Sequence, residues 1–204
     1  SLSNIKIAPS PEWLQKKLRA IGLNPINNVV DATNFVMREL GTPIHAFDTK
    51  FLNGKIVVKK VLKNQSFVTL DGIERKLSGE ELMITNGTEN LCIAGVLGGS
   101  YSSVSAETTS IFLESAVFDA VSIRKTARAH SLNTDASFRF ERGVDPELTL
   151  YALRRTAGII KEIAGGEIGM NEFSLNSGAY KPRKISIDLN RINSLIGFEI
   201  PKKS

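Results

Sequence analysis

One carboxylate of this sequence stands where a charged group is costly, in the middle of an apolar segment. Glu114 lies within the run Ile111-Phe112-Leu113-Glu114-Ser115-Ala116-Val117-Phe118. A buried carboxylate costs free energy unless a partner satisfies it. Two interpretations are open from the residues alone. Glu114 forms a structural ion pair or accepts hydrogen bonds from backbone amides, or it waits for a polar group on a ligand.

A histidine among apolar neighbours is the second candidate. His45 follows Pro43-Ile44, and Thr33-Asn34 precedes it in the chain. Histidine is a common general acid or base and a common positioner of ligands. A lone histidine of this kind is also a frequent packing residue, so both roles remain open for His45.

Other kinds of chemistry find little support in the sequence. His45, Cys92 and His130 are too few and too scattered for a structural zinc site, so we expect no metal site. The segment Gly95-Val96-Leu97-Gly98-Gly99 falls short of the dinucleotide fingerprint, and neither a Walker A loop nor a G-x-S-x-G elbow is present. Asp135 and Glu141 could pair as general acid and base, although two carboxylates in a polar loop are usually solvated.

A basic segment follows the apolar run. From residue 124 to residue 142, five basic side chains stand against two acidic ones, a local charge of +3: Arg124, Lys125, Arg128, Arg139 and Arg142 against Asp135 and Glu141. The whole chain carries 26 basic and 21 acidic residues, a net charge of +5. Such a run is either a solvated face or a contact for a polyanion such as RNA.

The elements that would position these residues can be read from periodicity and capping signals. Ser10-Pro11-Glu12 predicts a helix with Ser10 as N-cap and Gly22 as its end, and a second helix is expected over 28–40. Strands are then predicted at 55–61, 66–70, 73–77, 82–85, 91–96 and 110–118. Asp71-Gly72 marks a hairpin, and Asn86-Gly87 a longer loop.

Helical patterns return in the last third of the chain. We expect helices over 120–128 and from Asp145-Pro146 to Ile163, with a polar loop over 130–144 between them. Residues 176–184 are rich in small and polar residues and are typical of a linker. Helices grouped at both ends with antiparallel strands between them predict an α+β fold, with antiparallel or mixed sheets flanked by helices.

Composition narrows the class of protein. The chain has 204 residues, 42% of them hydrophobic, which suffices for a core. No apolar run approaches the roughly 20 residues of a membrane span, so we expect no membrane partner. One cysteine, Cys92, favours a reducing compartment, hence the cytoplasm. Because residues 1–4 lack an initiator Met and a signal peptide, we interpret the chain as a piece of a longer protein.

Five ordered motifs resemble one known family. They are residues 27–37 (NNVVDATNFVM), 41–48 (GTPIHAFD), 94–99 (AGVLGG), 113–116 (LESA) and 134–146 (TDASFRFERGVDP). Together they are similar to the B3/B4 domain of the bacterial phenylalanyl-tRNA synthetase β subunit, over about residues 9–175. Residues 1–8 are then expected to be a tail of the preceding segment, and 185–204 resembles the truncated start of the B5 domain.

The resemblance implies a parent enzyme that attaches phenylalanine to tRNA(Phe) with ATP and Mg²⁺ and assembles with an α subunit as α2β2. Phe138-Arg139-Phe140-Glu141 imitates an ATP-contacting motif of class II synthetases, but in this family that string belongs to B3/B4. Ligation is therefore implied for the parent and not for this piece, in which we expect no cofactor.

For this domain the resemblance implies hydrolysis of tRNA(Phe) mischarged with tyrosine. Tyrosine is phenylalanine plus a hydroxyl, and an apolar pocket rejects an added hydroxyl only about 100-fold. A site that requires the hydroxyl solves the problem, because phenylalanine would leave its buried polar groups unpaired.

The same resemblance implies the site residues. Glu114 and the Gly95 backbone would receive the tyrosine hydroxyl, and Ala94 and Gly98 would shape the wall. The amino-acid and adenosine end would be lined by His45, Thr33 and Asn34, and Ala136 would lie where a larger side chain blocks the pocket. Pro43 is a further expected substrate-binding residue. We expect a positioned water as nucleophile, with His45 a better candidate for positioning than for general base. Charge alone makes Arg124, Lys125 and Arg128 candidate tRNA phosphate contacts.

Two alternatives remain beside this hydrolase. One is a tRNA-binding module with a degenerate pocket, and the other is a scaffold that contacts the α subunit. A degenerate pocket would lack Glu114 or carry a bulky residue at position 136, and a scaffold would expose a large apolar patch.

Overall fold

The computed structural model describes residues 1–175 and 184–201, and these form two units. The first is Ser1–Phe173 and the second begins at Ser174. The predicted linker over 176–184 therefore lies almost wholly outside the described residues. In the second unit, Leu189–Ile196 forms helix α6, which Asp188 caps by accepting hydrogen bonds from two backbone amides. Whether this helix starts a B5 domain stays a prediction.

The first unit is built on three small sheets. The first sheet has the order β10-β1-β9-β2, the second β3-β6-β7-β8, and β4 pairs with β5 alone. The first contains β1 (Leu2–Ser3), β2 (Ile44–Asp48), β9 (Ile111–Ser115) and β10 (Glu167–Ile168). The second contains β3 (Val57–Lys60), β6 (Leu82–Thr85), β7 (Asn90–Ile93) and β8 (Leu97–Gly98), while the pair is β4 (Ser66–Val68) and β5 (Glu74–Lys76). All pairings are antiparallel, so the α+β expectation is confirmed.

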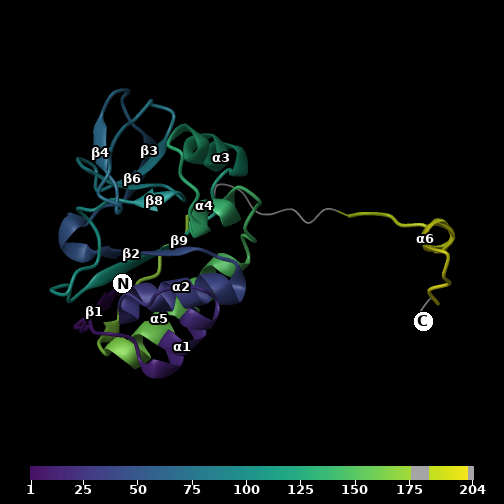
Figure 1. Cartoon of the computed structure of the whole chain (residues 1–204), viewed down its shortest axis with the longest axis horizontal. Coiled ribbons are helices and arrows are strands. Elements are labelled where there is room, and N and C mark those ends of the chain that lie inside the picture. Colours follow the sequence, from purple (N-terminus) through teal and green to yellow (C-terminus); the bar gives the residue numbers. More distant parts are fainter. Residues whose placement is uncertain (176–183, 202–204) are drawn as a thin grey trace. The chain divides into compact units, whose positions relative to one another are not determined.

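Helices cover these sheets in two groups, which Figure 1 separates clearly. The first group packs on the first sheet and consists of α1 (Glu12–Ala20), α2 (Asn28–Leu40) and α5 (Leu148–Ala164). The second lies beside the second sheet and consists of α3 (Ala120–Ala129) and α4 (Asp135–Phe140), and a 3-10 turn η1 (Thr49–Phe51) follows β2. Each group has its own buried cluster, with Val29 and Ile160 in one and Phe140 and Ile123 in the other.

Residues 1–8 belong to the first unit and do not form a separate tail. Leu2 is paired with Ile111 of β9, and Leu2 and Ile5 are 1% and 3% exposed in the core beneath α2 and α5. Strand β1 consists of Leu2 and Ser3 alone, and two residues are too short a pattern for a strand to be predicted from the sequence.

Two helix starts differ from the predictions. Ser10 does not cap α1, because its hydroxyl donates instead to the Asp31 carboxylate at 2.5 Å, and Pro11 occupies the cap position without a side-chain bond. Similarly, α5 starts at Leu148 while Asp145 accepts from the Glu147 amide before the helix. In both cases a local turn or a long-range partner competes for the capping side chain.

The expected polar loop over 130–144 contains a short helix, α4. Thr134 caps it by accepting from the Ser137 amide, and the Ser137 hydroxyl accepts from the Thr134 amide in return. This capping box uses serine where glutamate or glutamine is the usual signal. A six-residue helix is also too short to show a full apolar repeat, so no periodic pattern predicted it.

Candidate functional site

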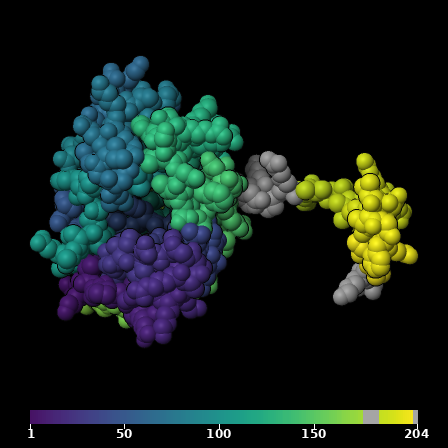
Figure 2. Space-filling view, viewed as in Figure 1, coloured from purple at the N-terminus to yellow at the C-terminus, as the bar shows by residue number. Residues whose placement is uncertain are grey.

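A cavity of about 470 Å³ opens between the two groups of helices. Figure 2 shows the surface hollowed where the N-terminal helices, the blue and teal strands and the green α3–α4 segment meet. The cavity lies in the size range of small-molecule sites. Its lining combines many apolar side chains with a few polar ones, among them Thr33, Asn34, His45, Cys92, Thr134, Asp135 and Glu114.

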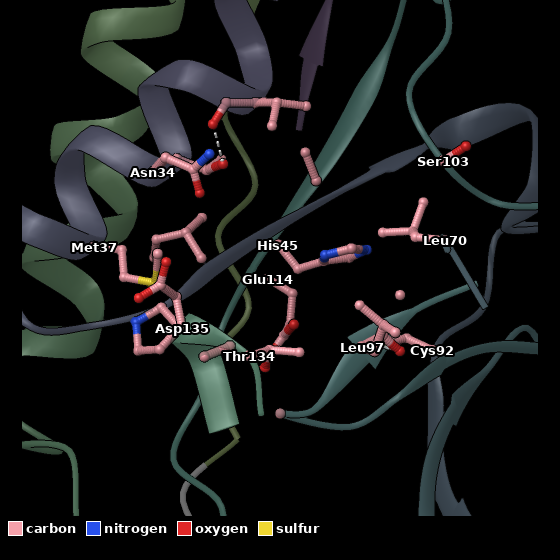
Figure 3. Close-up of a pocket in the computed structure, with 18 of the residues that line it drawn as sticks. Asn34, Met37, His45, Leu70, Cys92, Leu97, Ser103, Glu114, Thr134 and Asp135 are labelled. Atoms are coloured by element: carbon pink, nitrogen blue, oxygen red, sulfur yellow. Dashed lines mark hydrogen bonds between the residues drawn. The ribbon is translucent and has the colours of Figure 1, made fainter. Parts of the chain in front are cut away.

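Glu114 and His45 reach this cavity from neighbouring strands. β2 and β9 are antiparallel, and His45 is directly opposite Glu114 in their register. Residues opposite each other across two strands have side chains on the same face. Figure 3 shows both between helix α2, which carries Asn34 and Met37, and the strands that carry Cys92 and Leu97.

The Glu114 carboxylate has no hydrogen bond or ion pair to any other residue that the structure describes. Burial raises its pKa to about 7, and no cation lowers it again. Glu114 is nevertheless only partly buried, because one side of it borders the cavity. Of the two interpretations open from the sequence, the geometry matches a carboxylate that faces a ligand site and not one that forms a structural ion pair.

His45 combines a packing role with a position on the cavity wall. Its ring meets the fully buried Phe47 ring edge to face, with centroids 4.4 Å apart. Burial lowers the pKa of His45 to about 4, so the imidazole is neutral at pH 7. A neutral imidazole can donate one hydrogen bond and accept another, which suits positioning of a water or hydroxyl.

Gly95 and Gly98 occupy different parts of the wall. Gly95 has φ +67°, and an added Cβ would meet Phe118 at 2.7 Å and Ile123 at 2.8 Å, so its side-chain direction points into the core. Its backbone is therefore what borders the cavity. At Gly98, an added Cβ would meet His45 Cε1 at 2.8 Å, so the missing side chain leaves room for that ring.

The other predicted substrate-binding residues line the cavity, with the exception of Ala94. Thr33 and Asn34 line it from α2, Pro43 from the segment before β2, and Ala136 from α4. The Thr33 hydroxyl donates to the Val30 carbonyl at 2.7 Å, which leaves its oxygen free to accept. Ala94 does not line the cavity: it is 1% exposed and packs with Phe47, Leu91 and Cys92 behind the wall.

Several lining residues escaped the sequence analysis. Val30 and Met37 share the α2 face of Thr33 and Asn34, and the helical spacing of these four positions could have revealed them. Thr134, the cap residue of α4, also donates a hydrogen bond to the Val96 carbonyl at 2.7 Å, next to Gly95. The sequence positions of Cys92 and Leu70 did not indicate a site, because strand pairing brings both residues to the cavity.

The candidate acid–base pair Asp135 and Glu141 is not formed. Arg38 of α2 donates to both Asp135 oxygens at 2.7 and 2.8 Å, and Arg139 donates to Asp135 as well. Glu141 pairs with Arg142. Asp135 lines the cavity but is held by two guanidinium groups, so it bridges α2 and α4 and is not available as a base.

The basic side chains of α3 lie outside the cavity. The side chains of Arg124, Lys125 and Arg128 are all exposed, and none of these side chains forms an ion pair or hydrogen bond with another described residue. Within the described ranges, no group of three or more His, Cys, Asp or Glu side chains could hold a metal ion. None of the described helices has the length and apolar character to cross a membrane.

One family of domains matches most of this chain. The model of the B3/4 domain family matches residues 1–165. This chain belongs to the B3/4 domain family, and its resemblance to the B3/B4 domain of the phenylalanyl-tRNA synthetase β subunit is confirmed.

Relatives give the more particular assignment. The chain is 52% identical to a phenylalanine–tRNA ligase β subunit of Porphyromonas gingivalis over 96% of its length, which is 24% of that protein. It is 47% identical to the β subunit of Bacteroides fragilis over 100% of its length, which is 25% of that protein. The chain thus spans about a quarter of the curated relatives it matches. A crystallised N-terminal β-subunit fragment from Pyrococcus horikoshii is similar with a TM-score of 0.48 at 14% identity, covering 98% of this chain and 55% of that one.

Proposed function

We propose that this domain hydrolyses tRNA(Phe) mischarged with tyrosine, as the editing site of a phenylalanine–tRNA ligase β subunit. One observation supports this above the others: a carboxylate on a cavity wall that has no partner among the described residues and whose pKa is raised to about 7. A phenol can donate a hydrogen bond to such a group, whereas a phenyl ring cannot. The cavity would therefore favour tyrosine over phenylalanine.

The reaction would be attack of water on the ester that joins tyrosine to the terminal ribose. With the tyrosine hydroxyl on Glu114 and the Gly95 backbone, the ester would lie toward His45, Thr33 and Asn34, which line the same cavity. Neutral His45 would accept a hydrogen bond from the water and hold it for attack. The side-chain amide of Asn34 is a suitable donor for the developing oxyanion.

The activity of the parent protein is part of the same proposal. It would attach phenylalanine to tRNA(Phe) with ATP and Mg²⁺, together with an α subunit, in the cytoplasm where charged tRNA is used. The string 138–141, which imitates an ATP-contacting motif, does not fit that role in this domain. In the string 138–141, Phe140 is 3% exposed in the core and Arg139 is bonded to Asp135, so neither is available to a nucleotide.

A non-catalytic tRNA-binding module is the second candidate, and the exposed basic side chains of α3 favour it. The two functions differ in what Glu114 and His45 do. If the cavity is degenerate, removing either residue leaves the rate of deacylation unchanged, while charge reversal on α3 still weakens RNA binding.

Deacylation of tyrosyl-tRNA(Phe) by the complete parent protein tests the proposal. His45→Ala should slow release of tyrosine by about 100-fold or more, because it removes an interaction with the attacking water. Glu114→Ala should lower kcat/KM by about tenfold or more, because it removes the hydrogen bond to the tyrosine hydroxyl. Aminoacylation with phenylalanine serves as the control and should stay within about twofold. Unchanged deacylation in both variants would reject the assigned site.

A further inference from the structure

A half-exposed leucine forms part of the cavity rim. Leu70 lines the cavity although 48% of its surface is exposed. Its backbone amide donates to the Gly98 carbonyl at 3.0 Å. A Cβ added at Gly98 would meet Leu70 Cδ1 at 2.9 Å and His45 Cε1 at 2.8 Å, so these two side chains flank the same point of backbone. Figure 3 shows Leu70 next to the His45 ring.

The turn that carries Leu70 is held by a compact polar network. The Arg75 guanidinium donates to both Asp71 oxygens, each at 2.8 Å, and also to the Thr69 hydroxyl. Thr69 in turn donates to Asp71 at 2.6 Å. The hydrogen bonds from Arg75 and Thr69 hold the pKa of Asp71 well below its usual range.

This network differs from an ordinary surface ion pair. Exposed pairs contribute little because both side chains stay mobile and solvated. The Arg75 side chain is only 9% exposed, and its contact with Asp71 is bidentate. The pair joins β5 to the turn that follows β4, and an isolated two-stranded hairpin is marginally stable by itself.

We propose that Asp71 and Arg75 are positioning residues of the cavity, which hold Leu70 beside His45 as an apolar wall for the bound ester. This inference rests on the proposed function. Within the turn over 69–73, Leu70 lines the cavity and Asp71 does not. The Asp71–Arg75 network would therefore act on the substrate through Leu70. Glu114 lies on β9 opposite His45 and has no bond to Asp71 or Arg75, so the preference for a hydroxyl does not depend on the network.

The expected signature is a change in KM without a change in kcat. Loss of a well-placed aliphatic contact in an apolar pocket weakens binding by about tenfold or more. Contacts made equally to the substrate and the transition state change KM and leave kcat unaltered. Arg75→Met is a suitable variant, because it keeps much of the side-chain volume and leaves Asp71 exposed to water.

The test is a double-mutant cycle on deacylation of tyrosyl-tRNA(Phe) by the complete parent protein. Arg75→Met should raise KM about tenfold and leave kcat within about twofold. In a Leu70→Ala background, Arg75→Met should raise KM no further, because the residue it positions is already gone. Lys16→Met is the matched control: it removes the cation of an exposed i,i+4 pair with Glu12 on α1 and should leave KM unchanged.

Three results would contradict parts of this account, and they can be told apart. An unchanged KM in Arg75→Met overturns the positioning role, even if the melting temperature falls. The same holds if Arg75→Met raises KM equally with and without Leu70. A wild-type parent that leaves the tyrosyl ester intact overturns the proposed function, and this inference with it.

Discussion

His45 and Glu114 face each other across β2 and β9, one neutral and the other close to its titration point at neutral pH. Neither is bonded to the other among the described contacts, and both border one cavity. The antiparallel register places a histidine and a carboxylate from distant parts of the sequence on one wall. Burial keeps the His45 ring neutral and leaves the Glu114 carboxylate in need of a donor.

Glu114 should lower the stability of the domain at alkaline pH. Its folded pKa is about 7 against 4.5 in the unfolded chain, so between these values the folded state holds a proton that the unfolded state has lost. The free energy of unfolding therefore falls as pH rises through this window. Glu114→Gln should be more stable than wild type by about 1–3 kcal/mol at pH 8 and equal to it near pH 4. Urea unfolding at both pH values measures this, and parallel pH profiles would contradict it.

Glu81 should show the opposite pH dependence. It is 1% exposed, its oxygens accept from the Ser78 and Gly79 amides, and one lies 2.8 Å from His130 Nε2. Although burial opposes the shift, these hydrogen bonds lower its pKa to about 2. Its contribution is present above pH 4.5 and is lost as pH falls toward 2.

Glu81→Gln should therefore destabilise the chain by about 2–4 kcal/mol at pH 7, measured by urea unfolding. Glu80→Gln is the matched control, because the Glu80 carboxylate is next to Glu81 in the chain but is exposed and pairs with Lys60 at the surface. That variant should unfold almost as wild type does. Equal losses in the two variants would show that the buried network does not contribute as argued.

The two glycines of the wall should respond differently to alanine. In Gly95→Ala, the alanine must adopt a positive φ, and its Cβ would lie 2.7 Å from Phe118. We therefore expect the free energy of unfolding to fall by about 1–3 kcal/mol. Gly98→Ala instead displaces the His45 ring. Its melting temperature should change less, while deacylation of tyrosyl-tRNA falls about tenfold or more. Full deacylation by Gly98→Ala would argue against a role for the His45 position.

The α3 cations should affect RNA affinity through charge. Arg124→Glu with Arg128→Glu should weaken binding of tRNA(Phe) by the parent protein and make the affinity less dependent on salt. Arg19→Glu on α1 is a control with an exposed cation outside this helix. Filter binding across a salt series gives both quantities. An unchanged salt dependence would place the RNA elsewhere.

More of the candidate site than of the elements around it could be predicted from the sequence. Glu114 and His45 were visible because each breaks an apolar pattern, and Thr33 and Asn34 because a motif contains them. Leu70 and Ala94 show the limit: whether a neutral aliphatic residue lines a cavity or lies behind its wall depends on strand pairing and turn geometry. The predictions of Ser10 and Asp145 as helix caps were wrong for a related reason. A hydroxyl or carboxylate bonds to whichever donor or acceptor the tertiary structure brings nearest.

The most direct test of the account is a calorimetric titration of the domain with tyrosine and with phenylalanine, repeated on Glu114→Ala. We predict that wild type binds tyrosine about tenfold or more tightly than phenylalanine, from one hydrogen bond to a carboxylate, and that the variant loses this preference. Equal affinities in wild type, or a preference that survives in Glu114→Ala, would contradict it.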